Sequence, residues 1–234
     1  MASPYVTQCI ADGAVGLWTM GDASGTTCVD AKGNSNGTYT NTGGIDLTLP
    51  GIPGGLAAKG AKFTPGTGFV SVPDVAGQHV GDTFTVEAWV KLGATGSTLA
   101  IMSATNTASW LYELDNGSPS TPILEKNGTG IIVSSTSAGR ISVDGLWHHV
   151  VATKATSTLH TYTDGVDVTT GASNATISNS SGINLARKGL NGTEPFNGSL
   201  AMLALYPTAL SAATIAYHFH LGISEPALSA TGVG

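Results

Sequence analysis

Apolar and polar side chains alternate with the period of a β-strand in many short segments of the chain. In residues 84–91 (FTVEAWVK), one face carries four apolar side chains and the other carries Glu87, Trp89 and Lys91. Comparable runs predict strands at 69–72, 99–103, 110–114, 130–134, 148–153, 158–163 and 200–205. Clusters of Ser, Thr, Asn and Gly separate these runs at the spacing typical of a β-sandwich.

Two local signals add a hairpin and a helix. Asp164-Gly165 lies between the strand at 158–163 and a second β-rich run, and Asp-Gly in that position predicts a tight turn. Ser211 can cap a helix that begins at Ala212, carries an apolar stripe and ends at Gly222.

These elements predict an all-β fold, an antiparallel two-sheet β-sandwich with one short C-terminal helix. A chain of 234 residues fits one domain of this kind, which we place at residues 1–222. Residues 223–234 are rich in Pro, Ala, Ser and Gly, and we expect them to form an extended or weakly ordered tail.

Charge is scarce in this chain. Only 10% of the residues are charged while 41% are apolar, so the surface must consist largely of Ser, Thr, Asn and Gly. The net charge is −6, and the nine Lys and Arg residues are scattered singly. Nucleic acids and anionic lipids both require clustered basic residues, so we expect neither nucleic acid nor membrane as a partner. The N-terminal segment carries no secretory signal, so either a signal has been removed or the protein is assembled inside a cell.

The chain has two cysteines, Cys9 and Cys28. They allow one disulfide at most, which would tie the N-terminal segment to the first loop. Two buried free thiols are the alternative, and they fit a chain without a signal peptide.

Three segments resemble the laminin-G-like jelly-roll family. Residues 10–39, which contain ADGAVGLWTMGDASGTTCVDAKGNSNGTY, resemble its opening strand and first loop. Residues 144–165, from DGLWHHVVAT to YTDG, resemble its central strand and hairpin, and residues 196–219 resemble its closing strand and final helix. The resemblance implies a concanavalin A-like jelly roll. The opening segment also resembles the versions found in tailed-phage virion proteins.

Members of this family bind glycans, bind proteins, or decorate extracellular enzymes and viral particles. Fold alone does not choose among these functions. We expect a non-catalytic virion protein, either capsid-decorating or tail-associated; the alternative is a carbohydrate-binding module of a secreted or cell-surface protein. Its partners would be other virion proteins, further copies of itself, or glycans. As a repeated subunit, its tail or its Met1–Ile10 segment would become ordered only against a neighbour.

Enzymatic activity is not expected. Laminarinase-type enzymes share this sandwich and place carboxylates at alternate positions of one strand, in the pattern E-x-D-x-E. Glu113-Leu114-Asp115 begins that pattern, but position 117 is Gly and position 118 is Ser, so the acid/base carboxylate is missing.

The resemblance also implies a calcium site near the rim of the sandwich. The loop at 30–37 offers Asp30, Asn34 and Asn36 as oxygen ligands. Calcium-binding relatives commonly supply a further acidic residue from the closing strand, where this chain has Ala201-Met202. An Asn- and Gly-rich turn without a metal is the alternative.

Three aromatic residues are candidates for glycan binding. Trp89 lies opposite the apolar face of its strand, and Trp110 shares a face with Tyr112. If these faces are exposed, the rings can stack on sugars; if both faces are covered, the rings belong to the core. Trp18 and Trp147 fall in the strands matched to the family core, and we expect them to be packed inside.

Two pairs of histidines are close enough in the sequence to be considered as metal ligands. His148 and His149 are neighbours on a strand, so their side chains point to opposite faces. His218 and His220 lie two residues apart on the predicted helix and face different directions. Neither spacing predicts a transition-metal site.

Overall fold

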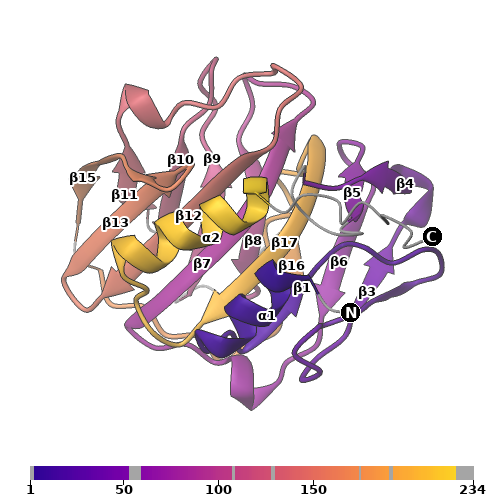
Figure 1. Cartoon of the computed structure of the whole chain (residues 1–234), viewed down its shortest axis with the longest axis horizontal. Helices are drawn as coiled ribbons and strands as arrows, with labels where there is room; N and C mark the ends of the chain where they lie inside the picture. Colours follow the sequence, from indigo (N-terminus) through magenta and orange to yellow (C-terminus); the bar gives the residue numbers. More distant parts are fainter. Residues whose placement is uncertain are drawn as a thin grey trace, which may run out of the picture.

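Two antiparallel sheets pack face to face in the computed structural model, which describes residues 3–52, 59–106, 109–127, 130–173, 175–189 and 192–224 (Figure 1). In spatial order, sheet A contains β14 (Val166–Asp167), β13 (Thr158–Thr163), β12 (His148–Ala155), β7 (Thr83–Leu92), β17 (Gly198–Tyr206), β5 (Lys59–Phe63) and β4 (Ile45–Pro50), with β1 (Gly16–Trp18) beside β17. Sheet B contains β15 (Thr169–Ala172), β11 (Gly130–Ser135), β10 (Pro122–Lys126), β9 (Trp110–Leu114), β8 (Leu99–Ala104), β16 (Ile183–Leu185), β6 (Phe69–Val72), β3 (Gly37–Thr40) and β2 (Thr27–Cys28).

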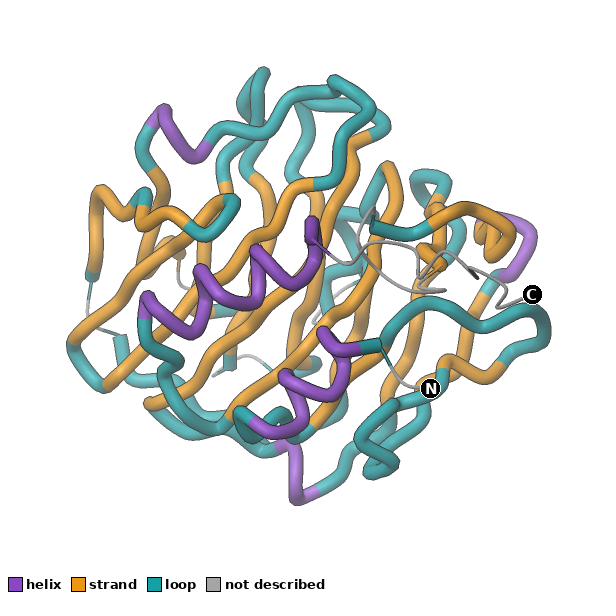
Figure 2. The backbone as a smooth tube through the Cα atoms, in the orientation of Figure 1, coloured by secondary structure: helices purple, strands orange, loops and turns teal. Residues whose placement is uncertain are grey.

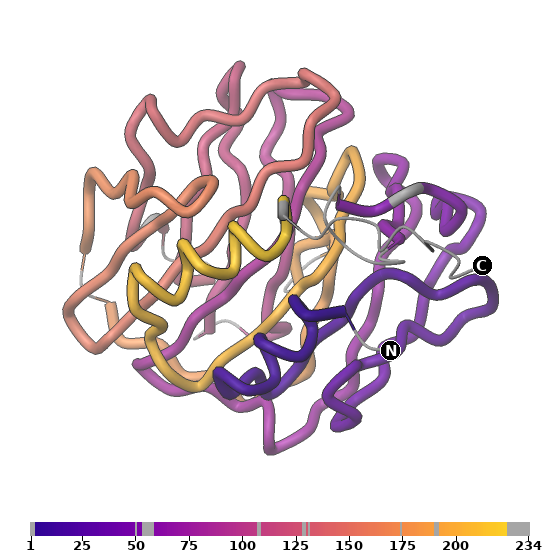
Figure 3. Tube along the Cα trace, viewed as in Figure 1, coloured from indigo at the N-terminus to yellow at the C-terminus, as the bar shows by residue number. Residues whose placement is uncertain are grey.

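Two α-helices, α1 (Pro4–Ala11) and α2 (Ala212–Ser224), lie over sheet A (Figure 2). They come from opposite ends of the chain and lie side by side on the same outer face (Figure 3). Single 3₁₀ turns occur at η1 (Thr42–Gly44), η2 (Ala76–Gln78) and η3 (Ser137–Gly139). Sheet B has no α-helix over it among the described residues.

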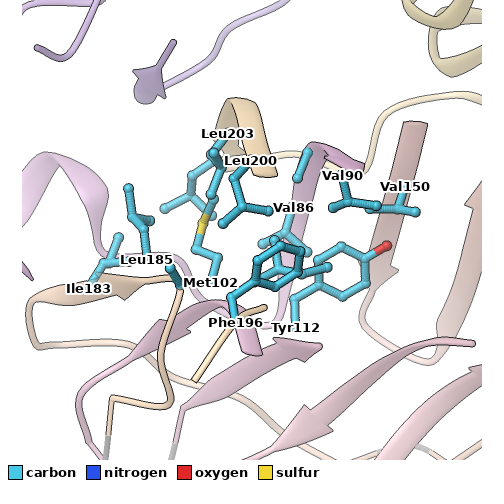
Figure 4. Close-up of a cluster of buried hydrophobic side chains, with 14 of the residues drawn as sticks. Val86, Val90, Met102, Tyr112, Val150, Ile183, Leu185, Phe196, Leu200 and Leu203 are labelled. Carbon is cyan, nitrogen blue, oxygen red and sulfur yellow. The ribbon is translucent and has the colours of Figure 1, made fainter. Parts of the chain in front are cut away.

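The main core fills the space between the two sheets. Val86 and Val150 from sheet A meet Met102 and Tyr112 from sheet B in one buried cluster (Figure 4). Phe196, which precedes β17, is buried in the same cluster. The strand alternation seen in the sequence places the apolar face of each strand inward, and burial of this apolar surface is the main force that holds the sheets together.

The predicted sandwich and its C-terminal helix are confirmed. Asp164 and Gly165 join β13 to β14 with φ of 51° and 78°, the left-handed geometry of a two-residue hairpin turn. Helix α2 begins at the predicted Ala212, and Ser211 Oγ accepts a hydrogen bond from Thr214 N at 3.1 Å.

Helix α1 was not predicted. It begins with Pro4 at its first position, and Tyr5, Val6 and Cys9 are buried against sheet A and α2. The expectation that the N-terminal segment orders only against a neighbour is therefore wrong for Ser3–Ile10, because its own chain buries it. Most of the predicted tail, residues 225–234, lies outside the described residues.

Both cysteines are buried and unpaired. Cys9 lies beneath the helices, whereas Cys28 lies in the core between the sheets, where its thiol contacts Met20 Sδ at 3.8 Å. Of the two alternatives from the sequence, the structure contains the free thiols. No helix in the described part of the chain is long and apolar enough to cross a membrane.

Candidate functional site

The three aromatic residues predicted to bind glycans are all buried, with 0% of their surface exposed. Trp110 and Tyr112 point into the core from the inner face of sheet B. Trp89 lies on the outer face of sheet A as predicted, but Phe219 of α2 stacks on it at 5.9 Å and Gly222 packs against its ring. The predicted glycan platform is therefore wrong, because α2 and the second sheet cover these rings.

The predicted calcium ligands organise a turn instead. The two carboxylate oxygens of Asp30 accept hydrogen bonds at 2.9–3.0 Å from four backbone N–H groups, those of Leu17, Lys32, Asn34 and Ser35. Asn36 Oδ1 accepts a bond from Asp30 N, and Asn34 Nδ2 donates to Val15 O. Four N–H dipoles that point at the carboxylate disfavour a cation there, so this geometry favours the Asn- and Gly-rich turn over the predicted calcium site.

Glu113 lies on the outer face of sheet B and is 2% exposed. Burial, a hydrogen bond with the Glu194 carboxyl and the nearby charge of Glu125 raise the pKa of Glu113 to about 9. Lys188 bonds Glu194 at 2.8 Å. The raised pKa keeps Glu113 protonated at pH 7, close to the carboxyl of Glu194.

Asp115, the second carboxylate of the partial glycosidase pattern, has hydrogen-bond partners on both oxygens. Its oxygens accept hydrogen bonds from Gly117 N at 3.0 Å, from Thr121 N at 2.8 Å and from Thr121 Oγ1 at 2.6 Å. Asp115 therefore holds the β9–β10 turn.

A buried ionic network lies under the helices, on the outer face of sheet A. Glu87 is fully buried at its centre. One carboxylate oxygen accepts bonds from Tyr5 Oη at 2.5 Å and lies 2.7 Å from His149 Nε2, and the other accepts a bond from Tyr206 Oη at 2.8 Å. His218 Nδ1 lies 3.1 Å from both oxygens.

Glu87 and His218 each stabilise the charged form of the other. Burial alone would raise the pKa of Glu87, but His218 and the hydrogen bond with His149 outweigh it and hold that pKa well below its ordinary value. Burial lowers the pKa of His218, but Glu87 and Asp12, whose Oδ2 lies 2.9 Å from His218 Nε2, raise it to about 9. The network is thus a buried ion pair that fastens both helices to sheet A.

Cys9, Glu87 and His218 lie close enough together to raise the question of a metal site. Burial holds the pKa of the Cys9 thiol well above its ordinary value, so Cys9 does not offer a thiolate. Both nitrogens of His218 already face carboxylates, and Glu87 already has partners on both oxygens. The residues present do not fit a metal ion.

Trp147, which we expected in the core, is the tryptophan that reaches the surface. The chain has four tryptophans, and Trp18, Trp89 and Trp110 are fully buried whereas Trp147 is partly exposed. The far edge of its ring lies over Gly60 of β5, where an added Cβ would come within 2.8 Å of Trp147 Cη2. Gly60 therefore makes room for the indole across the outer face of sheet A.

An open groove of about 260 Å³ lies on the same face of sheet A; Trp147 does not line it but contacts one of its lining residues, Lys91. We call it the Trp147 groove. The residues that line it include Leu49, Lys62, Lys91, Val143, Gly198 and Ser199. Lys91 Nζ lies 5.5 Å from the centroid of the Trp147 ring. Val143 and Leu146, which flank the groove and the tryptophan, are 53% and 61% exposed. An aromatic ring, exposed apolar side chains and a few polar groups around a hollow are typical of a small-ligand site.

The helix-covered part of sheet A and the Trp147 groove are continuous along the same strands. Trp89 and Lys91 both point outward from β7, two residues apart. Gly222 near the end of α2 packs on Trp89. Lys91 lies on the next outward position, where the groove begins. The sequence analysis proposed Trp89 for glycan binding and placed Trp147 in the core, and the structure reverses both positions, because no local pattern shows where α2 stops covering the sheet.

Two antiparallel sheets that pack face to face, with polar and aromatic side chains on an outer face, define a lectin-like β-sandwich. Residues 64–216 match the family model described as the concanavalin A-like lectin/glucanases superfamily. The chain belongs to this superfamily, as the laminin-G-like resemblance implied. No curated protein sequence matches the chain.

Solved structures show the same fold at low sequence identity. Domain 4 of AbnA, an extracellular GH43 arabinanase from Geobacillus stearothermophilus in complex with arabinotriose, is 19% identical with a TM-score of 0.65, over 88% of this chain and 98% of that domain. Trypanosoma rangeli sialidase in complex with sialic acid is 18% identical with a TM-score of 0.63, over 89% of this chain and 33% of that one. The binding domain of Paraclostridial Mosquitocidal Protein 1 is 15% identical with a TM-score of 0.61, over 89% and 52%.

Proposed function

We propose that this protein is a non-catalytic carbohydrate-binding module that acts outside the cell and binds glycan in the Trp147 groove. The observation that carries the proposal is the partial exposure of Trp147 beside an open groove, while the other three tryptophans are buried. An indole presents a large rigid surface to the C–H face of a sugar ring at a small entropic cost. The arabinotriose complex of a domain with the same fold is in keeping with this function.

The absence of catalysis is part of the proposal. A retaining glycosidase needs two carboxyl groups about 5–5.5 Å apart on either side of the scissile bond. Here Glu113 is buried next to Glu194, and Asp115 is held by Gly117 and Thr121. Neither arrangement leaves room for a glycosidic bond between two carboxyls.

Titration of the protein with a panel of oligosaccharides tests the binding function. We expect a change in tryptophan fluorescence on binding, since Trp147 is the ring that a ligand in the groove can reach. Trp147→Ala should weaken binding about tenfold or more, as the loss of a central aromatic contact usually does, while Trp147→Phe should restore much of it. Tyr217→Ala, which removes a 50% exposed ring on α2, is the matched control.

Two results would overturn this function. One is unchanged affinity in Trp147→Ala with the fold intact by circular dichroism. The other is release of reducing ends from a bound glycan that Glu113→Gln abolishes, which would make the protein an enzyme.

A place in a phage particle stays a prediction from the resemblance of residues 10–39. Mass spectrometry of purified particles from the source would test it directly.

A further inference from the structure

Three outward-facing residues on adjacent strands form the floor of the Trp147 groove. Ser199 of β17 pairs with Lys62 of β5 on one side and with Lys91 of β7 on the other. Adjacent strands lie about 4.8 Å apart, so the two lysine Cα atoms are separated by about 10 Å, with the buried Ser199 between them. We call these three residues the lysine row.

The two lysines of this row have no close ion-pair partner. Over the described residues, neither Lys62 nor Lys91 has a carboxylate oxygen within 4.0 Å of its ammonium. Lys154, 3.0 Å from Asp82, and Lys188, 2.8 Å from Glu194, form ion pairs, whereas Lys32, Lys59 and Lys126 resemble the row in having none among the described residues. In a chain with nine basic residues and a net charge of −6, two unpaired ammonium groups therefore line a single groove.

The acidic residues closest to the row have other partners. Asp46 pairs across the strands with Lys62, but its Oδ1 accepts bonds from Thr48 N at 2.8 Å and Thr48 Oγ1 at 2.7 Å. Asp144 accepts a bond from Leu146 N at 2.8 Å and lies 3.2 Å from His148 Nε2. Asp46 and Asp144 keep their own negative charge, and hydrogen bonds from Thr48, with a smaller contribution from Lys62, lower the pKa of Asp46, so part of the positive charge is offset. Lys62 and Lys91 are still the charged side chains that line the groove, where they can bind an anion.

We propose that the Trp147 groove selects an acidic saccharide, that is, one whose sugar rings carry carboxylate groups. This inference rests on the proposed glycan-binding function and adds the class of ligand. The carboxylate lies above Ser199 between Lys62 and Lys91, whose flexible stems let both ammonium groups turn toward it. The apolar face of the sugar contacts Trp147 and the exposed Val143. Charge and aromatic surface on the same groove distinguish such a ligand from a neutral glycan and from a simple anion.

The test compares acidic polysaccharides with their own methyl esters, which keep the backbone and lose the charge. Polygalacturonate, alginate and hyaluronan are titrated against the protein in the native and esterified forms, and binding is measured from tryptophan fluorescence and by calorimetry. We expect one acidic form to bind at least about tenfold more tightly than its ester, and this preference to shrink when salt is raised from 0.05 to 0.5 M (roughly a threefold shorter screening length).

Single-lysine variants assign the preference to the row. Lys62→Gln and Lys91→Gln should each weaken binding of the acidic form about tenfold, the usual loss for a charge-assisted hydrogen bond, and leave the ester unaffected. Lys62→Gln is the cleaner variant, because Lys62 is exposed and Lys91 also contacts Trp147. Lys32→Gln, at an exposed lysine in the Asp30 turn, is the matched control and should change nothing.

The possible outcomes distinguish a failure of the acidic-ligand inference from a failure of glycan binding itself. Equal binding of acid and ester, lost in Trp147→Ala but not in Lys62→Gln, would overturn the acidic ligand and leave glycan binding in place. Tight binding of an acidic glycan that both lysine variants leave unchanged would also overturn it. If no glycan, acidic or neutral, binds or alters the fluorescence, both proposals fail.

Discussion

Glu87 and Glu113 are both buried glutamates on the outer faces of the sandwich, yet their charges differ. Glu87 is 0% exposed on sheet A and Glu113 is 2% exposed on sheet B. The pKa of Glu87 lies well below its ordinary value, whereas that of Glu113 is raised to about 9. Burial disfavours the charged form of both carboxylates. The difference comes from their partners, since Glu87 faces donors and a cationic His218 while Glu113 faces Glu194 and Glu125.

The comparison shows that a buried acid on this fold serves one of two roles. An ionised glutamate with four polar partners joins elements that are distant in the sequence, whereas a neutral one packs as a polar side chain among other acids. Variants of the two residues should therefore behave oppositely.

Replacement of Glu87 should have the largest effect. Glu87→Gln removes the negative charge that compensates His218 and leaves two tyrosine hydroxyls facing an amide. We expect a loss of about 3–5 kcal/mol in the free energy of unfolding at pH 7, the usual cost of removing one partner from a buried ion pair. Urea denaturation measures it. A loss below about 1 kcal/mol would mean that the network does not hold the helices.

Acid should destabilise the protein through the same residue. Glu87 has a depressed pKa in the folded state, so its contribution to stability is present above its ordinary pKa of 4.5 and is lost as the pH falls through the lower folded value. Denaturation curves from pH 6 to pH 2 should show a steep decline in the wild type. In Glu87→Gln that decline should be shallower; parallel curves would rule out this assignment.

Alkaline pH should weaken the network through His218. Its folded pKa of about 9 exceeds its ordinary 6.5, so its contribution is complete below pH 6.5 and disappears as the pH rises through about 9. Glu113 acts in the same direction over a wider window, since it is neutral when folded up to about pH 9 but ionises above 4.5 when unfolded. His218→Gln should flatten the stability profile only between pH 6.5 and 9, and Glu113→Gln only between pH 4.5 and 9.

The smallest effect is expected for Glu113→Gln at pH 7. The folded protein already holds this side chain neutral, so an amide of the same shape replaces it without loss of charge. Folding of the variant no longer requires uptake of a proton, and we expect a slight gain in stability, opposite in sign to Glu87→Gln. A loss of more than about 1 kcal/mol in urea would show that Glu113 is ionised and that the two glutamates are alike.

The sequence contained enough information for the fold and for the two faces of each strand. The alternation in 84–91 correctly separated the inward side chains from Glu87, Trp89 and Lys91. It did not show what covers the outer face. The contact of Trp89 with Gly222 joins positions 133 apart in the sequence, and no local pattern encodes such a contact.

The candidate site was only partly accessible to sequence reasoning for the same reason. Trp147 was expected inside because it falls in a segment matched to a core strand of the family, yet it lies just before β12 and its ring contacts Gly60 of a distant strand. Asp30, Asn34 and Asn36 have the composition of a calcium loop and of a turn alike, and only the directions of the backbone N–H groups distinguish the two.

The pairing of α1 with α2 bears on how the protein is synthesised. His218 bonds Asp12, 206 positions earlier, and Glu87, 131 positions earlier. A ribosome that adds about 5–20 residues each second completes Asp12 and Glu87 several seconds before His218. Throughout that interval the nascent chain carries Glu87 on what will become β7 without His218, so burial of this carboxylate is less favourable than in the finished protein. We therefore expect the domain to reach its full stability only after α2 has been synthesised. A truncated product that lacks α2 should be less stable and more susceptible to proteolysis.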